Sequence, residues 1–332
     1  MIMKVAAIHR YGGPEEIQIL EVPIPSPKPG QVRIRVHAAA VNPVDLVTRE
    51  GILIPDDENE FQERKKLFAI EKPTFPMILG WDAAGVVDEV GEGVTRWEKG
   101  DRVIAFSQQI VHYAGTYAEY VVLDENVLAP APRNIGLAAA STIPLAGLTA
   151  YQAIKRLDLK PKQTLLINGP LGAVGGFALQ LAAHQGVTVL AVCCRQEAEF
   201  AYRLGAKYII DRDEKIEPQV REVVNEGVDA ALDVVGGKLA VDSFASIKMG
   251  GRYATTVPDF QKEGVSATGG RNITATNIWV QPNTEHLYQL SHLAEQGILT
   301  LHVAEAFKLE HAPQAHQLFS SRKIRGKIVL LP

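Results

Sequence analysis

The chain has 332 residues, of which 46% are hydrophobic and 22% are charged, the balance of an ordinary globular protein. Its 34 Lys and Arg and 38 Asp and Glu leave a net charge of −4, which argues against a broad nucleic-acid-binding surface. Two cysteines exclude a disulfide scaffold, and no apolar run approaches the roughly 18 residues of a membrane helix. Because the N-terminal stretch is also too polar for a secretory signal, we expect a cytoplasmic enzyme of two domains.

Residues 1–127 have the pattern of a β-rich domain. Polar and apolar residues alternate over 31–37, which is typical of a half-buried strand. Short apolar runs bounded by Gly and Pro follow at 85–90, 101–106 and 117–123. Such short, regularly spaced strands favour a small barrel or sandwich over a parallel sheet.

A charged stretch interrupts this first domain at residues 55–70. It contains DDENE from Asp56 and ERKK from Glu63, between two apolar regions. One interpretation is a solvated loop or surface helix. The other is a lid over the mouth of the substrate site.

Strand and helix patterns alternate over residues 128–283. The expected strands are 164–168, 188–192, 208–210, 229–233 and 252–256, and the expected helices are 136–157, 173–185 and 196–204. This alternation implies a parallel sheet that is covered on both faces. Residues 284–332 add a helix at 285–296 and a strand at 326–331, and we expect that strand to return to the first domain.

A glycine-rich turn, NGPLGAVG at residues 168–175, follows a strand and opens a helix. Glycines let such a turn be tight and let its backbone approach a pyrophosphate, which the helix N-terminus then stabilises. Pro170 breaks the strict GxGxxG spelling, but the strand–turn–helix context predicts a dinucleotide site. Its candidate cofactor-binding residues are Gly169, Gly172, Ala173, Val174 and Gly175.

The choice of cofactor depends on the residues at the end of the second strand of this alternating region. An acid there would bind a ribose 2′-hydroxyl, but this chain has Cys194 and Arg195, with no acid before Glu197. Arg212, just past the third strand, is a second candidate cation. Since a guanidinium matches a phosphate in shape and charge, the pattern favours NADP(H), unless both arginines simply face solvent.

Nine short motifs now form an ordered set. They are YGGPE at 11–15, VNPVD at 41–45, ILGWD at 78–82, EKGDRV at 98–103, GTYAEY at 115–120, LTAY at 148–151, DVVG at 233–236, GGR at 250–252 and RGKIV at 325–329. In this order the chain resembles the zinc-free quinone oxidoreductase branch of the medium-chain dehydrogenase/reductase superfamily. The resemblance implies an α/β fold with a doubly wound Rossmann domain at 128–283 and a GroES-like catalytic domain at 1–127 and 284–332.

The resemblance also bears on metal binding. Zinc-bearing relatives hold the catalytic ion with a Cys, a His and a second Cys, and the matching places here look like Asn42, Trp81 and Leu145. An indole and an isobutyl group do not ligate zinc. We therefore predict a metal-free site.

Without a Lewis acid, a quinone or an electron-poor enone is an easier hydride acceptor than a plain ketone. The resemblance implies that Asn42 and Asp45 are catalytic residues beside the nicotinamide. Asn42 could donate to the substrate oxygen, and Asp45 could orient the loop, relay a proton or serve as a structural cap. The further cofactor-binding residues that it implies are Pro43, Thr149, Val235, Val257 and Arg325.

We therefore predict an NADPH-dependent, metal-free oxidoreductase that transfers hydride to quinones or similar activated carbonyl compounds. Two alternatives stay open: an NADPH-dependent reductase of α,β-unsaturated ketones and aldehydes, and a non-catalytic NADPH-binding sensor or structural protein. The expected partner is a small molecule, with neither nucleic acid nor membrane. Pairing of an edge strand near 274–280 predicts a homodimer.

Overall fold

The computed structural model of the protein describes residues 1–53, 57–68, 72–107, 114–257, 270–321 and 324–332. The chain divides into two compact units. Unit 1 comprises Met1–Leu145, Pro282–Glu295 and Leu301–Pro332, and unit 2 comprises Ala146–Gln281 and Gln296–Thr300. The first boundary lies at Leu145, whereas the sequence pattern changes near residue 128.

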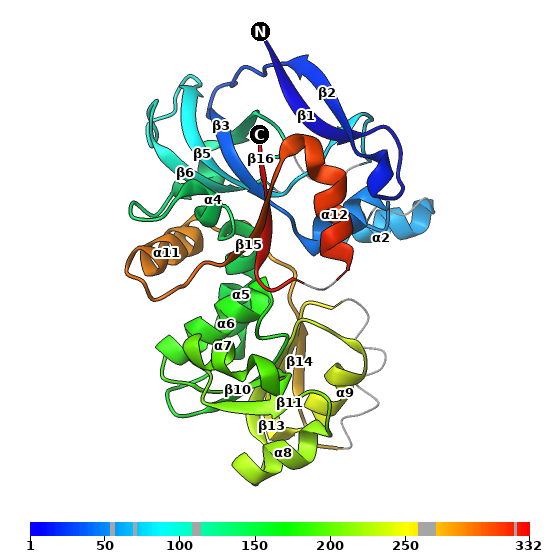
Figure 1. Ribbon diagram of the computed structural model, residues 1–332, viewed down its shortest axis with the longest axis vertical. Helices are drawn as coiled ribbons and strands as arrows, with labels where there is room; N and C mark the ends of the chain where they lie inside the picture. The colour runs from blue at the N-terminus through cyan, green and yellow to red at the C-terminus, as the bar shows by residue number, and fades with distance from the viewer. Residues whose placement is uncertain (54–56, 69–71, 108–113, 258–269, 322–323) are drawn as a thin grey trace. The chain divides into compact units, whose positions relative to one another are not determined.

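Two β-sheets form the framework of unit 1 (Figure 1). Their strands are β1 (Ile2–Ile8), β2 (Gln18–Pro23), β3 (Gln31–Ala40), β4 (Met77–Ile78), β5 (Asp82–Val90), β6 (Arg102–Phe106), β7 (Tyr120–Asp124), β8 (Leu128–Pro130), β15 (Val303–Lys308) and β16 (Lys327–Leu331). The larger sheet has the order β15-β16-β3-β5-β6-β8, with β7 also paired to β3, and the smaller has the order β2-β1-β4. These short, mostly antiparallel strands form the β-rich, GroES-like part of the fold.

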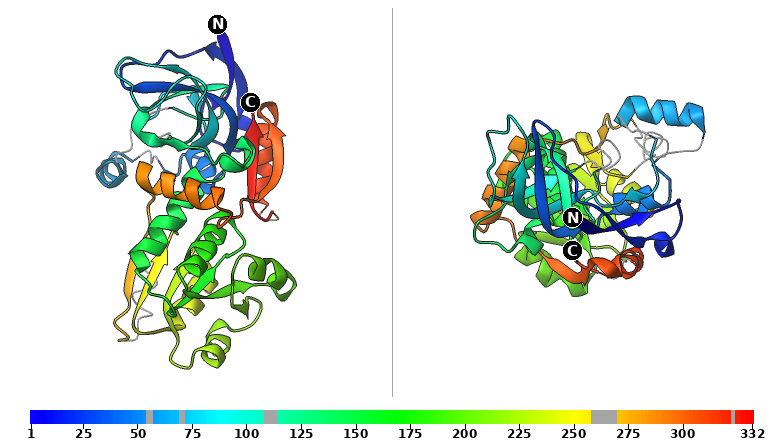
Figure 2. Two further views of the ribbon diagram at one scale, coloured as in Figure 1. Left: turned by 90° about the vertical axis from the view of Figure 1, so that its left-hand side faces the viewer. Right: turned by 90° about the horizontal axis from the view of Figure 1, so that it is seen from above.

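The C-terminal strand returns to unit 1, as the sequence predicts. β16 pairs antiparallel with β3, with Val329 opposite Ala40 and Leu330 opposite Ala39. In Figure 1 the red C-terminal strand β16 accordingly runs beside the blue strand β3, and Figure 2 gives two further views. Alternate apolar residues of β3, such as Val32, Ile34 and Val36, are buried in the core of this unit.

Short helices complete unit 1. They are α1 (Pro43–Arg49), α2 (Glu58–Phe68), α4 (Leu137–Ala140), α11 (Thr284–Glu295) and α12 (Ala312–Ser320). The described part of the charged stretch is therefore helical in α2, where Phe61 is buried and an exposed ion pair joins Glu60 to Arg64. This is the surface helix of the first interpretation, while residues 54–56 and 69–71 lie outside the described ones and the lid stays a prediction.

The single helix predicted over 136–157 is wrong, because the structure has two. α4 ends at Ala140, and α5 begins at Pro144 and runs to Leu157. Proline lacks an amide hydrogen for the helical ladder but is well suited to a first helical position, so Pro144 begins a new helix.

Unit 2 is a six-stranded parallel sheet with helices on both faces (Figure 1). Its strands are β9 (Thr164–Asn168), β10 (Thr188–Cys193), β11 (Tyr208–Asp211), β12 (Val228–Asp233), β13 (Ile247–Thr255) and β14 (Thr274–Asn277), in the order β11-β10-β9-β12-β13-β14. Its further helices are α6 (Ala173–His184), α7 (Ala198–Arg203), α8 (Ile216–Val223) and α9 (Gly237–Ala245). This is the doubly wound Rossmann arrangement that the alternating pattern predicts.

The register of this sheet aligns the carboxyl ends of its strands. Asn168 at the end of β9 lies opposite Val192 of β10 and Asp233 of β12. Asp211 lies opposite Cys193, and Asp233 lies opposite Thr255. The segments that follow these strands therefore emerge along one edge, where doubly wound folds bind their ligands. Among the described helices none is long and apolar enough to cross a membrane.

Candidate functional site

The turn between β9 and α6 has the backbone that its glycines allow. Gly169 has a φ of +72°, which L side chains rarely adopt. A Cβ at Gly175 would lie 2.0 Å from the carbonyl oxygen of Gly169. Glycine at this position therefore lets the first turn of α6 pack directly on the loop.

The start of α6 fits a pyrophosphate. Gly172 is its N-cap residue, and a Cβ there would meet only the Gly169 oxygen, at 3.6 Å. The next residues, Ala173 and Val174, begin the helix, so their amide hydrogens have no place in its ladder. An open cradle at the N-terminus of a 12-residue helix suits the phosphates of a dinucleotide.

Arg195 is held by two acids rather than turned simply to solvent. Its Nε donates to Asp211 Oδ2 at 2.7 Å and its Nη2 donates to Glu214 Oε1 at 3.1 Å, while 72% of the side chain stays exposed. The hydrogen bond from Arg195 lowers the pKa of Asp211. A 3-10 turn (Arg195–Glu197) with Cys194 as its N-cap fixes the backbone here. The guanidinium is thus placed at the end of β10 with much of its surface open.

Arg212 stands at the end of the neighbouring strand, β11. Its Nε lies 3.9 Å from Asp213 Oδ1, and half of its side chain is exposed. The structure therefore brings both arginines to the strand-end edge that also carries the glycine turn. Sequence reasoning missed the acids beside them, because it sought an acid only after the second strand.

Asp233 organises the next part of the edge, and sequence reasoning missed this role. The buried carboxylate accepts hydrogen bonds from Asn168 Nδ2 at 3.1 Å, from the Val235 amide at 3.2 Å and from the Tyr253 hydroxyl at 3.1 Å. Burial and the negative charge of Asp233 raise the pKa of Tyr253. The signal was an acidic residue at the end of an apolar strand. Burying a carboxylate costs free energy unless hydrogen-bond donors surround it.

The other predicted cofactor residues have different surroundings. Val235 follows the end of β12 and is 42% exposed. Val257 follows the end of β13, and its backbone amide donates to Thr255 Oγ1 at 3.0 Å. Thr149 is buried within α5. Arg325 is exposed immediately before β16, and Pro43 is the first residue of α1, both in unit 1.

Asn42 and Asp45 form the capping box of α1. Asp45 Oδ2 accepts the Asn42 amide hydrogen at 2.8 Å, and both residues are buried. Asn42 Nδ2 donates to the Ala40 carbonyl at 3.1 Å, and Asn42 Oδ1 accepts from Lys327 Nζ. The turn is therefore fixed through its backbone and through its side chains.

Two buried side chains that can carry charge, Asp82 and Lys327, lie beside this turn, and sequence reasoning missed both. Asp82 accepts the Ala40 amide at 3.2 Å and the Leu145 amide at 3.3 Å, and Lys327 Nζ donates to the Val41 carbonyl at 2.9 Å. Each is a charged residue at the start of an apolar strand, β5 or β16, and that is the signal that could have revealed them.

These buried groups shift the acidity of the two carboxyls. Burial raises the pKa of Asp82 to about 6, against the opposing charge of Lys327 and the amides that bind it. Burial, together with the charge of Asp82, raises the pKa of Asp45 to about 7. Burial lowers the pKa of Lys327, against both carboxylates. Asp45 is thus a buried carboxyl that changes charge near neutral pH.

Two of the three places that match zinc ligands hold buried side chains with no ligating atom. The Trp81 indole donates to Thr48 Oγ1 at 3.3 Å, and Trp81 and Leu145 are both buried. Among the described residues no three His, Cys, Asp or Glu side chains gather as metal ligands would. Zinc independence stays a prediction from the types of residue present.

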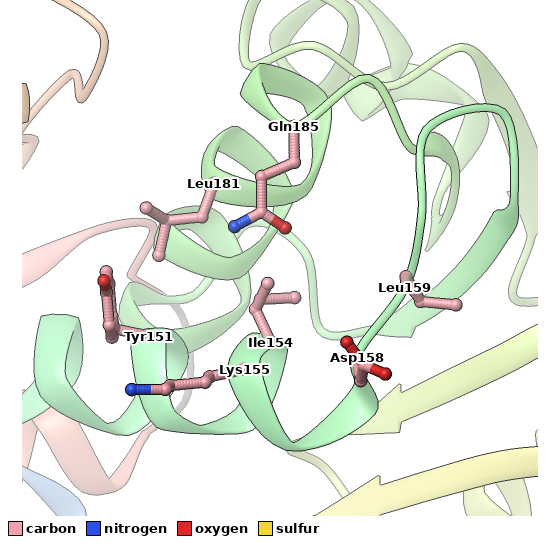
Figure 3. A pocket seen from close by; sticks show the side chains of 7 residues that line it. All are labelled: Tyr151, Ile154, Lys155, Asp158, Leu159, Leu181 and Gln185. Carbon is pink, nitrogen blue, oxygen red and sulfur yellow. The ribbon is translucent and has the colours of Figure 1, made fainter.

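A surface pocket of about 230 Å³ lies between α5 and α6 (Figure 3). Its lining includes Tyr151, Ile154 and Lys155 from α5, with Leu181 and Gln185 from the far end of α6. About 15 Å of helix separates that end from the glycine turn. The pocket is therefore separate from the strand-end edge.

Comparisons with known proteins agree with this two-part fold. The alcohol dehydrogenase GroES-like domain family matches residues 28–133, and the zinc-binding dehydrogenase family matches residues 204–330. A 2-haloacrylate reductase from a Burkholderia species is 30% identical, covering 100% of this chain and 99% of its own. The quinone oxidoreductase of Rattus norvegicus is 26% identical, covering 99% and 98%.

A solved structure extends the likeness to three dimensions. The quinone oxidoreductase from Coxiella burnetii superposes with a TM-score of 0.86 at 28% identity, and the match covers 100% of both chains. The likeness therefore extends over both parts of the fold and the whole length of the chain. The chain belongs to the quinone oxidoreductase branch of the medium-chain dehydrogenase/reductase superfamily, and it is an oxidoreductase that uses a nicotinamide cofactor.

Proposed function

We propose that this oxidoreductase uses NADPH and transfers hydride, without zinc, to quinones or similar activated carbonyl compounds. The observation that carries the choice of cofactor is Arg195, a guanidinium anchored by Asp211 and Glu214 yet largely exposed beside the strand ends. An anchored guanidinium can bind a 2′-phosphate through its remaining N–H groups with little loss of conformational entropy. Arg212 adds a second positive charge at this edge.

The residues in the place of zinc ligands support the metal-free part of the proposal. Trp81 and Leu145 offer no ligating atom to zinc. When bound, the cofactor supplies the hydride from nicotinamide C4. An acceptor whose carbonyl is conjugated to the reacting carbon needs less electrophilic help, which favours quinones over plain ketones.

The contacts of the Asn42 turn support a positioning role for it. The side-chain amide of Asn42 donates to the Ala40 carbonyl. The Asn42 side chain also lowers the pKa of Asp82. Asp45 caps the same turn from a fully buried position. Of the roles considered for Asp45, we therefore propose that it orients the loop that carries Asn42.

A second candidate function is the reduction of an activated carbon–carbon double bond. The relative from Burkholderia carries the name 2-haloacrylate reductase, and that name favours this candidate. In such a substrate the hydride also lands on a carbon conjugated to a carbonyl. The two functions make the same demands on the residues described above, so they differ only in measured rates.

The test is the initial rate of NADPH oxidation, and separately of NADH oxidation, by a para-quinone and by a simple enone, with a chelator present. We expect chelator-resistant turnover that is faster with the quinone and prefers NADPH. A preference for the enone would transfer the proposal to the second function. Cofactor binding with negligible turnover of either acceptor would instead support the non-catalytic binding protein.

Arg195→Gln tests the choice of cofactor. The loss of a charged hydrogen bond to a phosphate is worth about 1.5–3 kcal/mol, so the KM for NADPH should rise by roughly 10-fold to 100-fold, with little change for NADH. Arg203→Gln is the matched control, because Arg203 is similarly exposed and pairs with Glu199 on α7. An equal rise for both cofactors, or a wild-type preference for NADH, would contradict the 2′-phosphate role.

A further inference from the structure

A chain of buried polar side chains lies behind the Asn42 turn. Arg49, at the end of α1, approaches His316 of α12, with Nη1 and Nδ1 2.9 Å apart. His316 Nε2 lies 3.2 Å from the Tyr117 hydroxyl, and the two rings meet edge to face with centroids 5.7 Å apart. All three side chains are at most 1% exposed.

The chemistry of Arg49 fixes the direction of these hydrogen bonds. A guanidinium donates and never accepts, so His316 Nδ1 must be the acceptor. Burial and the nearby Arg49 lower the pKa of His316 to about 3, so the ring is neutral and its one hydrogen sits on Nε2. His316 therefore donates to Tyr117, and the hydroxyl oxygen accepts.

The hydroxyl hydrogen of Tyr117 then needs an acceptor of its own. Asp45 Oδ1 is buried and has no hydrogen-bond partner of standard geometry among the residues that the structure describes. The Tyr117 hydroxyl and Asp45 nevertheless shift each other's pKa: the hydroxyl lowers the pKa of Asp45, and the charge of Asp45 raises the pKa of Tyr117. Because the Tyr117 oxygen accepts from His316, its own hydrogen is available to the carboxylate oxygen that lacks a donor.

We infer that Arg49, His316 and Tyr117 form a one-way hydrogen-bond relay that orients Asp45 against the Asn42 turn, and that Tyr117 and His316 are positioning residues for this turn. Asp45 then accepts at both oxygens, from the Tyr117 hydroxyl at Oδ1 and from the backbone amide of Asn42 at Oδ2. The three relay residues are buried, and the relay acts on the turn rather than on a substrate. Its effect on the reaction rate rests on the proposed function.

The relay favours the charged form of Asp45. The charged or titratable groups that act on this carboxyl are Asp82 of β5, Lys327 of β16 and Tyr117 of the segment before β7. Arg49 of α1 acts on Tyr117, and His316 of α12 contacts it. Lys327 and the Tyr117 hydroxyl favour the carboxylate, whereas burial and Asp82 favour the acid. Loss of the hydroxyl should therefore shift the titration of Asp45 to higher pH.

The sign of the effect on stability follows from linkage. The pKa of Asp45 is higher in the folded state, about 7, than its ordinary value of 3.8. Its contribution to stability is full at low pH and is lost as the pH rises towards 7. In a protein without the hydroxyl this loss should continue to a higher pH.

The experiment measures urea unfolding of the full chain between pH 5.5 and about 9 for wild type and variants. The loss runs from the unfolded pKa to the folded pKa, so the stability curve levels off at the folded pKa of Asp45. Tyr117→Phe should move the midpoint of this levelling-off upward by about one pH unit. Tyr120→Phe is the matched control, because it removes a hydroxyl from a partly exposed ring in β7 and should leave the midpoint unchanged.

His316 supplies a matched pair. His316→Gln keeps an acceptor and a donor in one side chain and should behave like wild type, whereas His316→Leu should shift the midpoint as Tyr117→Phe does. His316→Leu also leaves a buried Arg49 donor without its partner, so if this variant does not fold, Tyr117→Phe decides alone. An unchanged midpoint in Tyr117→Phe, or a His316→Gln that shifts as Leu does, would overturn the relay.

Quinone turnover is the second measurement. Tyr117→Phe should lower kcat by about 10-fold with little change in the KM for NADPH, and His316→Gln should retain activity. If the wild-type enzyme does not reduce quinones, the proposed function fails, but the unfolding experiment still tests the relay. A shifted midpoint with unchanged kcat would overturn the positioning role.

Discussion

Gly172 and Gly175 belong to one turn, but their surroundings make them serve different purposes. A Cβ at Gly175 would overlap the Gly169 carbonyl oxygen, at 2.0 Å, and that backbone cannot yield as a flexible side chain would. At Gly172 the same atom would meet only one protein atom, at 3.6 Å, and the φ of −78° suits any residue. Gly175 is therefore needed for the packing of the turn on α6, whereas Gly172 leaves open space at the start of the helix.

The two alanine substitutions should therefore separate stability from binding. Gly175→Ala should lower the free energy of unfolding by about 1–3 kcal/mol, because the loop or the helix must move. Gly172→Ala should change it by less than about 0.5 kcal/mol, yet weaken NADPH binding by at least about 10-fold, since its methyl group occupies the phosphate cradle. Thermal unfolding and fluorescence titration with NADPH measure the two effects.

Each variant is the control for the other. If Gly172→Ala binds NADPH as tightly as wild type, the cradle at the start of α6 does not hold the pyrophosphate. If Gly175→Ala keeps its full stability, the close approach to Gly169 is relieved elsewhere in the turn.

At the scale of elements, polar contacts join segments that are distant in sequence. Lys327 of β16 reaches the turn before α1, some 285 residues earlier in the chain. Asp82 of β5 binds the amides of Ala40 and Leu145, so one carboxylate connects β3, β5 and the start of α5. Lys327 is the cation that these buried carboxyls share.

Removal of that cation should destabilise the protein in a pH-dependent way. Lys327→Met keeps most of the side-chain volume but leaves Asp82 and Asp45 without a buried counter-charge, which costs about 3–5 kcal/mol at pH 8. Because their pKa values are already raised, to about 6 and 7, both carboxyls are protonated near pH 5 and the loss there should be smaller.

Urea unfolding at pH 5 and pH 8 measures the difference between these losses. Lys308→Met is the control, because Lys308 is an exposed residue of the neighbouring strand β15 and its loss should matter little at either pH. A loss of stability that is equal at the two pH values would contradict the shared counter-charge.

The elements themselves were largely predictable, because each depends on local pattern. Buried parallel strands such as β9 and β10 are continuous apolar runs, and the glycine turn that links β9 to α6 carries its own signal. The break at Pro144 was missed, since apolar residues continue through it without a change of pattern. The family assignment is confirmed along the whole chain.

The site was predictable only in part, for a physical reason. Residues within one turn, such as Asn42 and Asp45 or the three glycines, are close because they are neighbours in sequence. The partners that set their chemistry come from elsewhere: Lys327 and Tyr117 lie far from Asn42 in sequence, and no periodicity announces such a contact. Buried charge at the start of an apolar strand is the one local sign that a distant partner exists.

At the scale of the whole molecule, the described sheet of unit 2 ends at strand β14. β14 is the last strand in the order, and among the described strands it pairs only with β13. The Ile278 amide donates to the Thr255 carbonyl at 2.7 Å, so amides alternate along β14 and that of Ala275 points away from β13. A row of outward donors and acceptors is a template for pairing with another chain.

We therefore predict a homodimer in which β14 of one protomer pairs with β14 of its partner, because a twofold axis lets one edge serve both chains. Light scattering should give about twice the chain mass of 36.1 kDa. Ala275→Pro removes the outward amide hydrogen without removing a donor to β13, and it should shift the mass towards that of the monomer. Ala275→Val keeps the hydrogen and should stay dimeric. A wild-type mass of one chain would exclude the dimer. A dimer that survives Ala275→Pro would place the contact on another surface, because an edge-to-edge ladder cannot form fully without that donor.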